Sequence, residues 1–220
     1  MVLALDHAHH QEHSRIHVQK NETVSRRIAF FDFDGTITTK DTLLEIIKYR
    51  HGKNKFYIGF LLHSPWLVAY KLGIISNQLA KEKVLRYFFR KMSPEQFQAM
   101  ADEFARKEIP ALIRPKALLE IRKLQESGAE VVIVSASAEN WIREWCRSLG
   151  VQLIATQLEE KNGKMTGRIV GRNCHGEEKV ARIKSRFDLE DYKEVYCYGD
   201  TSGDKPMLGL GTARFYRPFR

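Results

Sequence analysis

The stretch from Ile28 to Thr36 constrains the fold of this chain more than any other. Its first part, Ile28 to Phe31, is apolar at every position, which is typical of a strand buried on both faces of a parallel sheet. Asp32 and Asp34 follow, and Gly35 allows the sharp turn that ends such a strand. Ligands of open α/β sheets bind at the carboxyl ends of strands. We therefore expect both carboxylates in one site, one as nucleophile and the other as acid or base.

Strands and helices alternate in the last half of the chain. The segment 158–169 predicts a hairpin, because Asn162-Gly163 is a strong signal for a tight turn between two strands. Alternation of this kind favours an α/β fold, here a three-layer, Rossmann-like core around a parallel sheet. The predicted strands are 131–134, 153–155, 195–198 and 213–216, and the predicted helices are 115–127, 138–149 and 177–187.

Residues 40–114 interrupt this plan with a block of helical patterns. Asp41 is predicted to cap the first of these helices and Ser93 a later one. The block contains 14 Lys and Arg against 7 Asp and Glu, a local net charge of +7 that accounts for most of the +9 of the whole chain. This charge indicates either a solvated helical surface or a field that attracts anionic substrates or anionic lipid headgroups. No aromatic-interleaved basic motif is present, so no nucleic-acid partner is expected.

The segment 56–75 is the most apolar of the chain, with 14 of 20 residues hydrophobic. Pro65 interrupts it and Lys71 charges it, which argues against a membrane-spanning helix. We expect most of its apolar side chains to fill the core of the helical block. The alternative is that some face outward, to contact a membrane or hold an acyl chain.

The cysteine usage indicates a reducing compartment. Cys146, Cys174 and Cys197 form an odd and widely spaced set that suggests no disulfide framework, so we expect a cytoplasmic protein, with a peripheral position at the membrane as the alternative. The pair Cys174-His175 invites a metal or thiol role, but two residues do not make a metal site. The first 27 residues carry five of the eight histidines and are expected to be a disordered extension.

Four further residues stand at strand ends or at the first turn of a following helix. Ser135 follows the predicted strand 131–134, where a hydroxyl and nearby N–H groups can hold a phosphate oxygen. Lys179 lies on the first turn of a helix, the unfavourable end of the helix dipole for a cation, which suits a lysine directed at a bound anion. Asp200 and Asp204 flank a glycine-rich turn and offer the hard oxygen ligands that Mg²⁺ prefers.

The order and positions of these motifs resemble those of the haloacid dehalogenase-like hydrolases, and specifically the phosphoserine-phosphatase-like branch with a helical cap. The resemblance covers residues 28 to about 216. It implies an α/β phosphatase core at 28–39 and 115–220, with a helical cap at 40–114 and the His-rich extension at 1–27 in front of it.

The resemblance also implies a role for each motif residue. Asp32 is expected to form an aspartyl-phosphate, and Asp34 to protonate the leaving oxygen and then activate water. Mg²⁺ is expected on Asp32, the backbone carbonyl of Asp34 and Asp200, with Asp204 in support. Ser135 and Lys179 are expected to hold the phosphoryl oxygens, and Asp41 takes the position of a substrate-contacting glutamate.

The expected activity is therefore Mg²⁺-dependent hydrolysis of a small phosphorylated metabolite, such as phosphoserine or histidinol phosphate. Ser135 is followed by Ala136-Ser137 where the family usually has two glycines, and Gly203 replaces a common asparagine, which weakens the case for phosphoserine itself. The alternatives are a lipid phosphate phosphatase at the membrane surface, a phosphotransferase or mutase with the same motifs, and a non-catalytic membrane-surface binding protein. The oligomeric state is left open.

Overall fold

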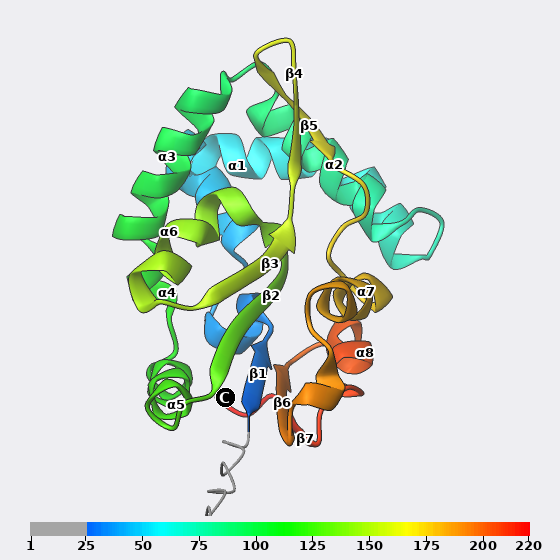
Figure 1. The fold of residues 1–220 in the computed structure, drawn as a ribbon. Helices are drawn as coiled ribbons and strands as arrows, with labels where there is room; N and C mark the ends of the chain where they lie inside the picture. The colour runs from blue at the N-terminus through cyan, green and yellow to red at the C-terminus, as the bar shows by residue number, and fades with distance from the viewer. Residues whose placement is uncertain (1–25) are drawn as a thin grey trace, which may run out of the picture.

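The centre of the molecule is a five-stranded, all-parallel sheet with the strand order β3-β2-β1-β6-β7 (Figure 1). The computed structural model describes residues 26–220, so residues 1–25 of the predicted His-rich extension lie outside the described part. The parallel α/β sheet predicted from the sequence is confirmed. Its strands are β1 (Arg27–Phe31), β2 (Glu130–Ala138), β3 (Gln152–Thr156), β6 (Glu194–Gly199) and β7 (Ala213–Tyr216).

Strand β1 is the middle strand, and its side chains supply both faces of the core. Phe31 and Ala29 belong to the hydrophobic cluster formed with α5 (Pro115–Glu126) and α6 (Glu139–Leu149). Ile28 and Phe30 belong to the opposite cluster, formed with α7 (Glu177–Arg186) and α8 (Lys205–Leu208). Successive side chains of a strand point to opposite faces, so a strand that is apolar at every position is covered on both sides. The result is a core of three layers.

Four helices stand between β1 and α5, in the segment for which the cap is predicted. They are α1 (Thr42–Lys71), α2 (Asn77–Phe89), α3 (Pro94–Lys107) and the short α4 (Ile109–Leu112). The two predicted helix caps are confirmed, because Asp41 accepts a hydrogen bond from the N–H of Leu44, and Ser93 forms a reciprocal capping box with Gln96. Helices α1, α2 and α3 lie above the carboxyl end of the sheet in Figure 1.

Helix α1 is interrupted at Gly52, not at Pro65. Pro65 lies inside the helix, whereas Gly52 has φ of 75° and ψ of 165° and interrupts the helical conformation. Gly52 has no Cβ and adopts this positive φ without the steric cost that other residues meet.

The apolar segment 56–75 is mostly exposed, so the expectation that it fills the core of the cap is wrong for most of its large side chains. Phe56 is buried, and Phe60 and Leu67 are partly buried against the core. Tyr57, Ile58, Leu61, Leu62, Trp66, Val68, Tyr70, Leu72 and Ile74 are exposed. No helix within residues 26–220 is long and apolar enough to cross a membrane.

A hairpin connects the parallel sheet to the helices of the predicted cap. Strands β4 (Leu158–Lys161) and β5 (Lys164–Ile169) are joined by Asn162-Gly163, which have φ of 52° and 66°, as the predicted turn requires. The N–H of Ile169 donates to the carboxylate of Glu82 on α2 at 3.0 Å. Met165 exchanges backbone hydrogen bonds with Lys91 and Met92, in the loop between α2 and α3.

Candidate active site

A cavity of about 310 Å³ lies between the carboxyl ends of the central strands and helices α1 and α2. Five of the seven site residues predicted from the sequence line it: Asp32, Asp34, Asp41, Lys179 and Asp204. The carboxylate of Asp200 lies next to Asp32 and Asp204, whereas Ser135 is buried and does not line the cavity.

Three aspartates form a compact group at the floor of this cavity. One carboxylate oxygen from each of Asp32, Asp200 and Asp204 lies within 4.8 Å of the other two, and all three residues are buried. Within residues 26–220 this is the one group of acidic, His or Cys side chains with metal-binding spacing. Clustered carboxylate oxygens are the ligands that suit Mg²⁺, and buried carboxylates need nearby positive charge. The donor set therefore fits the ion that the sequence predicts.

Lys179 supplies a permanent positive charge to the group. Its side chain is 1% exposed, and its ammonium donates to Asp32 Oδ1 at 2.6 Å and to Asp204 Oδ1 at 2.8 Å. Burial would lower the pKa of Lys179, but the two carboxylates raise it above its usual value. Burial raises the pKa of Asp32 to about 7, and Lys179 does not fully offset this. Lys179 thus pairs with two of the three carboxylates and leaves the pKa of Asp32 raised, which is consistent with a site that a further cation would complete.

Thr36 and Gly35 hold the group together from the turn after β1, and sequence reasoning assigned neither of these roles. The hydroxyl of Thr36 lies 3.0 Å from Asp32 Oδ2 and 3.1 Å from Asp200 Oδ1. Gly35 has φ of 84°, and a Cβ on it would lie 2.6 Å from Asp200 Oδ2. The guanidinium of Arg220 forms an ion pair with the same carboxylate. The position of Asp200 is therefore set by contacts from both ends of the described chain.

Asp34 faces the cavity and is held by groups outside the aspartate cluster. Its Oδ1 accepts the N–H of Thr42 at 2.7 Å, and its Oδ2 accepts the hydroxyl of Ser137 at 2.5 Å. Burial raises the pKa of Asp34 to about 6, the charge of Asp41 adds to the rise, and the two hydrogen bonds oppose it. A carboxyl group with a pKa near neutrality can both donate and accept a proton, as an acid/base catalyst must.

Ser137 lines the cavity, and Ser135 does not. Strand β2 continues to residue 138, beyond the predicted end at residue 134, and this extension carries Ser137 to the cavity. The Oγ of Ser135 accepts the N–H of Ser137 at 2.9 Å, so Ser135 supports the end of β2 that presents Ser137 to the cavity. The sequence Ser135-Ala136-Ser137 contained both hydroxyls, but only the length of the strand distinguishes between them.

The Cys174-His175 pair separates into two environments. Cys174 is fully buried in the cluster beneath α7. His175 lines the cavity, and its Nε2 would lie 2.2 Å from a Cβ at position 203. The glycine that replaces a common asparagine at position 203 therefore makes room for the imidazole of His175. Burial lowers the pKa of His175, which keeps its ring neutral near neutral pH.

The cap side of the cavity is mostly apolar but contains one cation. Lys81, on α2, donates from its Nζ to the carbonyl of Ala136 at 2.6 Å and thereby joins α2 to the end of β2. Burial lowers the pKa of Lys81. The apolar lining comes from α1 and α2: Leu43, Leu44, Phe60, Leu67, Tyr70, Ala80 and Val84.

Comparison with known proteins gives a consistent result. Residues 29–209 match the family model of the haloacid dehalogenase-like hydrolases. Protein CicA of Caulobacter vibrioides is 36% identical over 192 residues, which cover 86% of this chain and 85% of that protein. A probable phosphatase of Mycobacterium tuberculosis is 28% identical over 89% of this chain and 70% of its own length. The structure of a substrate-bound phosphoserine phosphatase covers 87% of this chain and 85% of its own, with 21% identity and a TM-score of 0.59, which shows a shared fold.

Proposed function

Because this chain belongs to the haloacid dehalogenase-like hydrolases and is a phosphatase of that family, we propose that it hydrolyses phosphate monoesters in a Mg²⁺-dependent reaction. One observation carries the proposal: Asp32, Asp200 and Asp204 form a compact buried group, and Lys179 pairs with Asp32 and Asp204 beside a cavity that Asp34 also lines. This arrangement combines a nucleophile, a proton donor and concentrated positive charge within reach of one phosphoryl group.

In the proposed reaction, a carboxylate oxygen of Asp32 attacks phosphorus while the bond to the ester oxygen breaks. Asp34 donates its proton to that leaving oxygen. Asp34 then accepts a proton from water, whose oxygen attacks the aspartyl-phosphate, so that inorganic phosphate leaves and the carboxylate of Asp32 is restored. The raised pKa of Asp34 and its hydrogen bonds to Thr42 and Ser137 suit both transfers.

Positive charge stabilises the phosphoryl group during both steps. Lys179 is proposed to hold a phosphoryl oxygen, and the same role for Ser135 stays a prediction. Mg²⁺, held by Asp32, Asp200 and the backbone carbonyl of Asp34 with Asp204 in support, would neutralise the charge that develops on phosphoryl oxygens. Transfer to an acceptor other than water would use the same residues, so a phosphotransferase activity is tested by supplying alcohols with the substrate.

Asp32→Asn tests the proposal with a generic aryl phosphate. We expect turnover to fall by at least about a thousandfold and the acid-labile phosphoenzyme to disappear, because the amide is a poor nucleophile. Removal of Mg²⁺ from the wild-type protein should also abolish turnover. Asp191→Asn is the matched control, since Asp191 is exposed and precedes the opposite end of β6. Near wild-type rates in Asp32→Asn would show that the nucleophile is assigned incorrectly.

The cavity supports a small phosphorylated metabolite as the substrate. Asp41 and Lys81 place one negative and one positive side chain in the wall, where they can pair with the ammonium and carboxylate of a phospho-amino acid or the amine of histidinol phosphate. A lipid phosphate is the second candidate, because the remaining wall on α1 is apolar, with Leu44, Phe60 and Leu67 among its residues. A screen of phosphoserine, histidinol phosphate and short-chain lipid phosphates by kcat/KM distinguishes the two.

A cytoplasmic location is part of the same proposal. Cys146, Cys174 and Cys197 are all free and buried, which agrees with a reducing compartment.

A further inference from the structure

The second part of α1, residues 53–71 after the break at Gly52, has an apolar face that no described residue covers. The side chains of Tyr57, Leu61 and Val68 recur at spacings of four and seven residues, and therefore lie on one side of the helix. Leu61 is 74% exposed and Leu62 is 60% exposed. We define the α1 outer face by its exposed apolar residues: Tyr57, Ile58, Leu61, Leu62, Val68 and, past the helix end, Leu72 and Ile74.

The opposite side of the same helix already supplies what the cap needs for its own core. Phe56 is buried, the centroid of the Phe60 ring lies 6.3 Å from that of the Phe88 ring of α2, and Gly59 allows α2 to approach closely, since a Cβ there would lie 2.3 Å from the Phe88 ring. Packing within the cap is thus complete without the α1 outer face. A contiguous exposed apolar surface of this kind marks an interaction site in a folded protein.

The charges around the α1 outer face have one sign. No Asp or Glu occurs between Glu45 and Glu82, a segment that includes all of residues 53–71. Lys53, Lys55 and Lys71 are exposed at its two ends. None of the ion pairs found in residues 26–220 involves these three lysines. The adjoining surface of α2 continues the pattern with Lys83, Arg86, Arg90 and Lys91, which line a hollow beside His63 and Tyr87.

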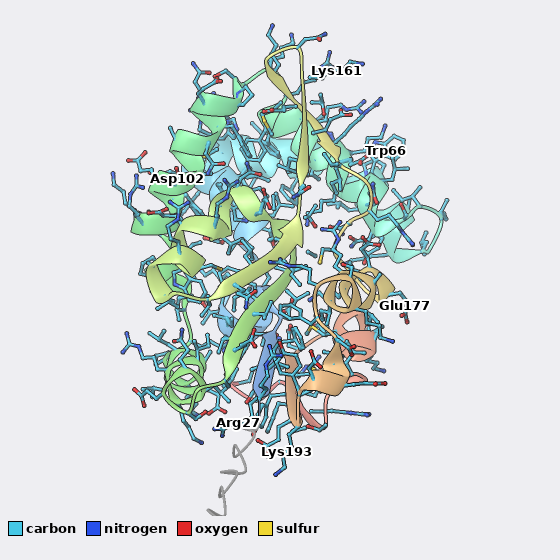
Figure 2. All side chains as sticks on the ribbon, viewed as in Figure 1. Arg27, Trp66, Asp102, Lys161, Glu177 and Lys193 are labelled. Atoms are coloured by element: carbon cyan, nitrogen blue, oxygen red, sulfur yellow. The ribbon has the colours of Figure 1, made fainter. Side chains whose placement is uncertain are left out.

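Trp66 stands between the apolar and the basic parts of this surface. Its ring is 40% exposed, and the ammonium of Lys83 lies 4.3 Å from the ring centroid. Figure 2 shows Trp66 at the periphery of the cap, on the side away from Asp102 of α3. The turn between α1 and α2, which carries Leu72 and Ile74, projects from the body of the protein in Figure 1. An apolar face with basic flanks and a tryptophan at their boundary has the composition of a helix that lies in a membrane interface.

We infer that the α1 outer face docks on the surface of an anionic lipid bilayer, with the apolar side chains inserted between headgroups and the lysines paired with lipid phosphates. Charge selects this occupant over a second copy of the chain. A two-fold dimer would place the same patch against itself and bring lysines opposite lysines, whereas anionic headgroups complement them. The inference does not rest on the proposed phosphatase reaction.

The docking face and the substrate cavity are two sides of one helical segment. Phe60, Leu67 and Tyr70 line the cavity, while Leu61, Leu62 and Val68, next to them in the sequence, belong to the α1 outer face. Docking would therefore hold the apolar cavity wall beside the lipid surface. A phosphate monoester carried by a lipid would then be presented at the membrane, and soluble monoesters would still reach the cavity from water.

Vesicle co-sedimentation of the full chain tests the inference. We expect binding to vesicles of phosphatidylcholine with phosphatidylglycerol, and much weaker binding to phosphatidylcholine alone. Leu61→Ser combined with Leu62→Ser should reduce the partition coefficient by about tenfold or more, because two inserted apolar side chains are lost. Leu119→Ser is the matched control, since Leu119 is 64% exposed on α5, in the core domain. All of these positions are exposed, so the thermal melting of each variant should match the wild type.

Charge variants test the electrostatic part. Lys53→Gln with Lys71→Gln should weaken binding to the anionic vesicles, whereas Lys116→Gln with Lys123→Gln on α5 should not. Added salt should weaken binding only in part, because salt screens charges but leaves apolar insertion intact. The emission of Trp66 should shift to the blue on binding, since Trp141 and Trp145 are already buried, and Trp66→Phe should remove the shift.

Three results would overturn the inference. The first is no binding to anionic vesicles, and the second is an equal loss of binding in the Leu119 control. The third is a dimer in solution that the Leu61, Leu62 substitutions dissociate, together with no vesicle binding. Asp32→Asn should bind vesicles as the wild type does, and the Leu61, Leu62 variant should hydrolyse a soluble aryl phosphate at the wild-type rate. Failure of docking and failure of the catalytic assignment are therefore separate observations.

Discussion

Individual residues set the geometry of the aspartate cluster, and Gly35 shows how narrow the tolerance is. Its φ of 84° turns the chain after β1, and its missing Cβ leaves space for the carboxylate of Asp200. Any larger residue must both adopt an unfavourable backbone conformation and displace this carboxylate. Two independent constraints therefore require glycine at this position: the positive φ and the close approach of the Asp200 carboxylate.

Gly35→Ala should therefore reduce the activity far more than it reduces the stability of the fold. We expect kcat to fall by about a hundredfold, because the carboxylate of Asp200 moves by a distance comparable to the overlap, and the Mg²⁺ concentration for half-maximal rate to rise. Gly163→Ala is the matched control: its φ is 66°, but its Cβ would meet nothing within 4 Å. Both variants should lose about 1–2 kcal/mol of stability. Equal activity in the two would contradict the steric role of Gly35.

The two proposed roles of Asp34 can be separated by the choice of leaving group. Asp34→Asn should still be phosphorylated by an aryl phosphate, whose leaving group needs little protonation, but should dephosphorylate slowly because no base activates water. Rapid-quench kinetics should show the phosphoenzyme accumulating. Normal decay of that intermediate would rule out Asp34 as the base. With an alkyl phosphate, we expect the phosphorylation step itself to slow.

At the scale of elements, the β4–β5 hairpin contacts the helices of the predicted cap. Met165 of the hairpin forms backbone hydrogen bonds with the loop between α2 and α3, and Gly167 allows the hairpin to pack closely against α2. A Cβ at this position would lie 2.4 Å from the Cα of Arg86. Together with the Lys81 contact to the carbonyl of Ala136, this packing fixes the cap over the cavity.

Gly167→Ala should loosen the cap without touching the cavity. Its overlap with the backbone of α2 should cost about 1–3 kcal/mol, measured by urea unfolding, and amide exchange should accelerate in α2. Gly171→Ala serves as the control, because its φ of 67° is similar but open space surrounds it. If Gly171→Ala destabilised the protein as much, the loss would come from backbone strain alone.

For the whole molecule, burial of the three cysteines offers a probe of global opening. Burial raises the pKa of both Cys146 and Cys197 to about 12, and it also raises that of Cys174. The reactive thiolate is therefore a fraction of about 10⁻⁴ at pH 8 for the first two. All three lie in the cores on either side of the sheet.

We expect an aromatic disulfide reagent to modify none of the three thiols on the time scale of minutes in the folded protein, and all three in concentrated guanidinium. The rate in intermediate denaturant should follow the population of open protein. Rapid modification of one thiol under native conditions would reveal local opening of the corresponding core, on the α6 side for Cys146 or the α7 side for Cys174.

The sequence by itself determined the sheet, the order of the motifs and the family. Each of these depends on local chemistry: the apolar run before Asp32 is typical of a buried strand, Asn162-Gly163 favours one turn type, and Ser93 caps the helix that follows it. The family assignment is confirmed by the match over residues 29–209. The predicted division into extension, core and cap and the catalytic roles of the individual residues stay predictions.

Only the tertiary structure decided which side chains meet and which face water. Ser137 reaches the cavity because β2 is longer than its apolar run, and Lys81 enters it because the hairpin holds α2 against the core. The helix at residues 53–71 is apolar around most of its circumference. The spacing of its apolar residues therefore does not indicate which side is buried. Only the tertiary structure distinguishes its exposed side from its buried side, because burial depends on which other residues pack against the helix.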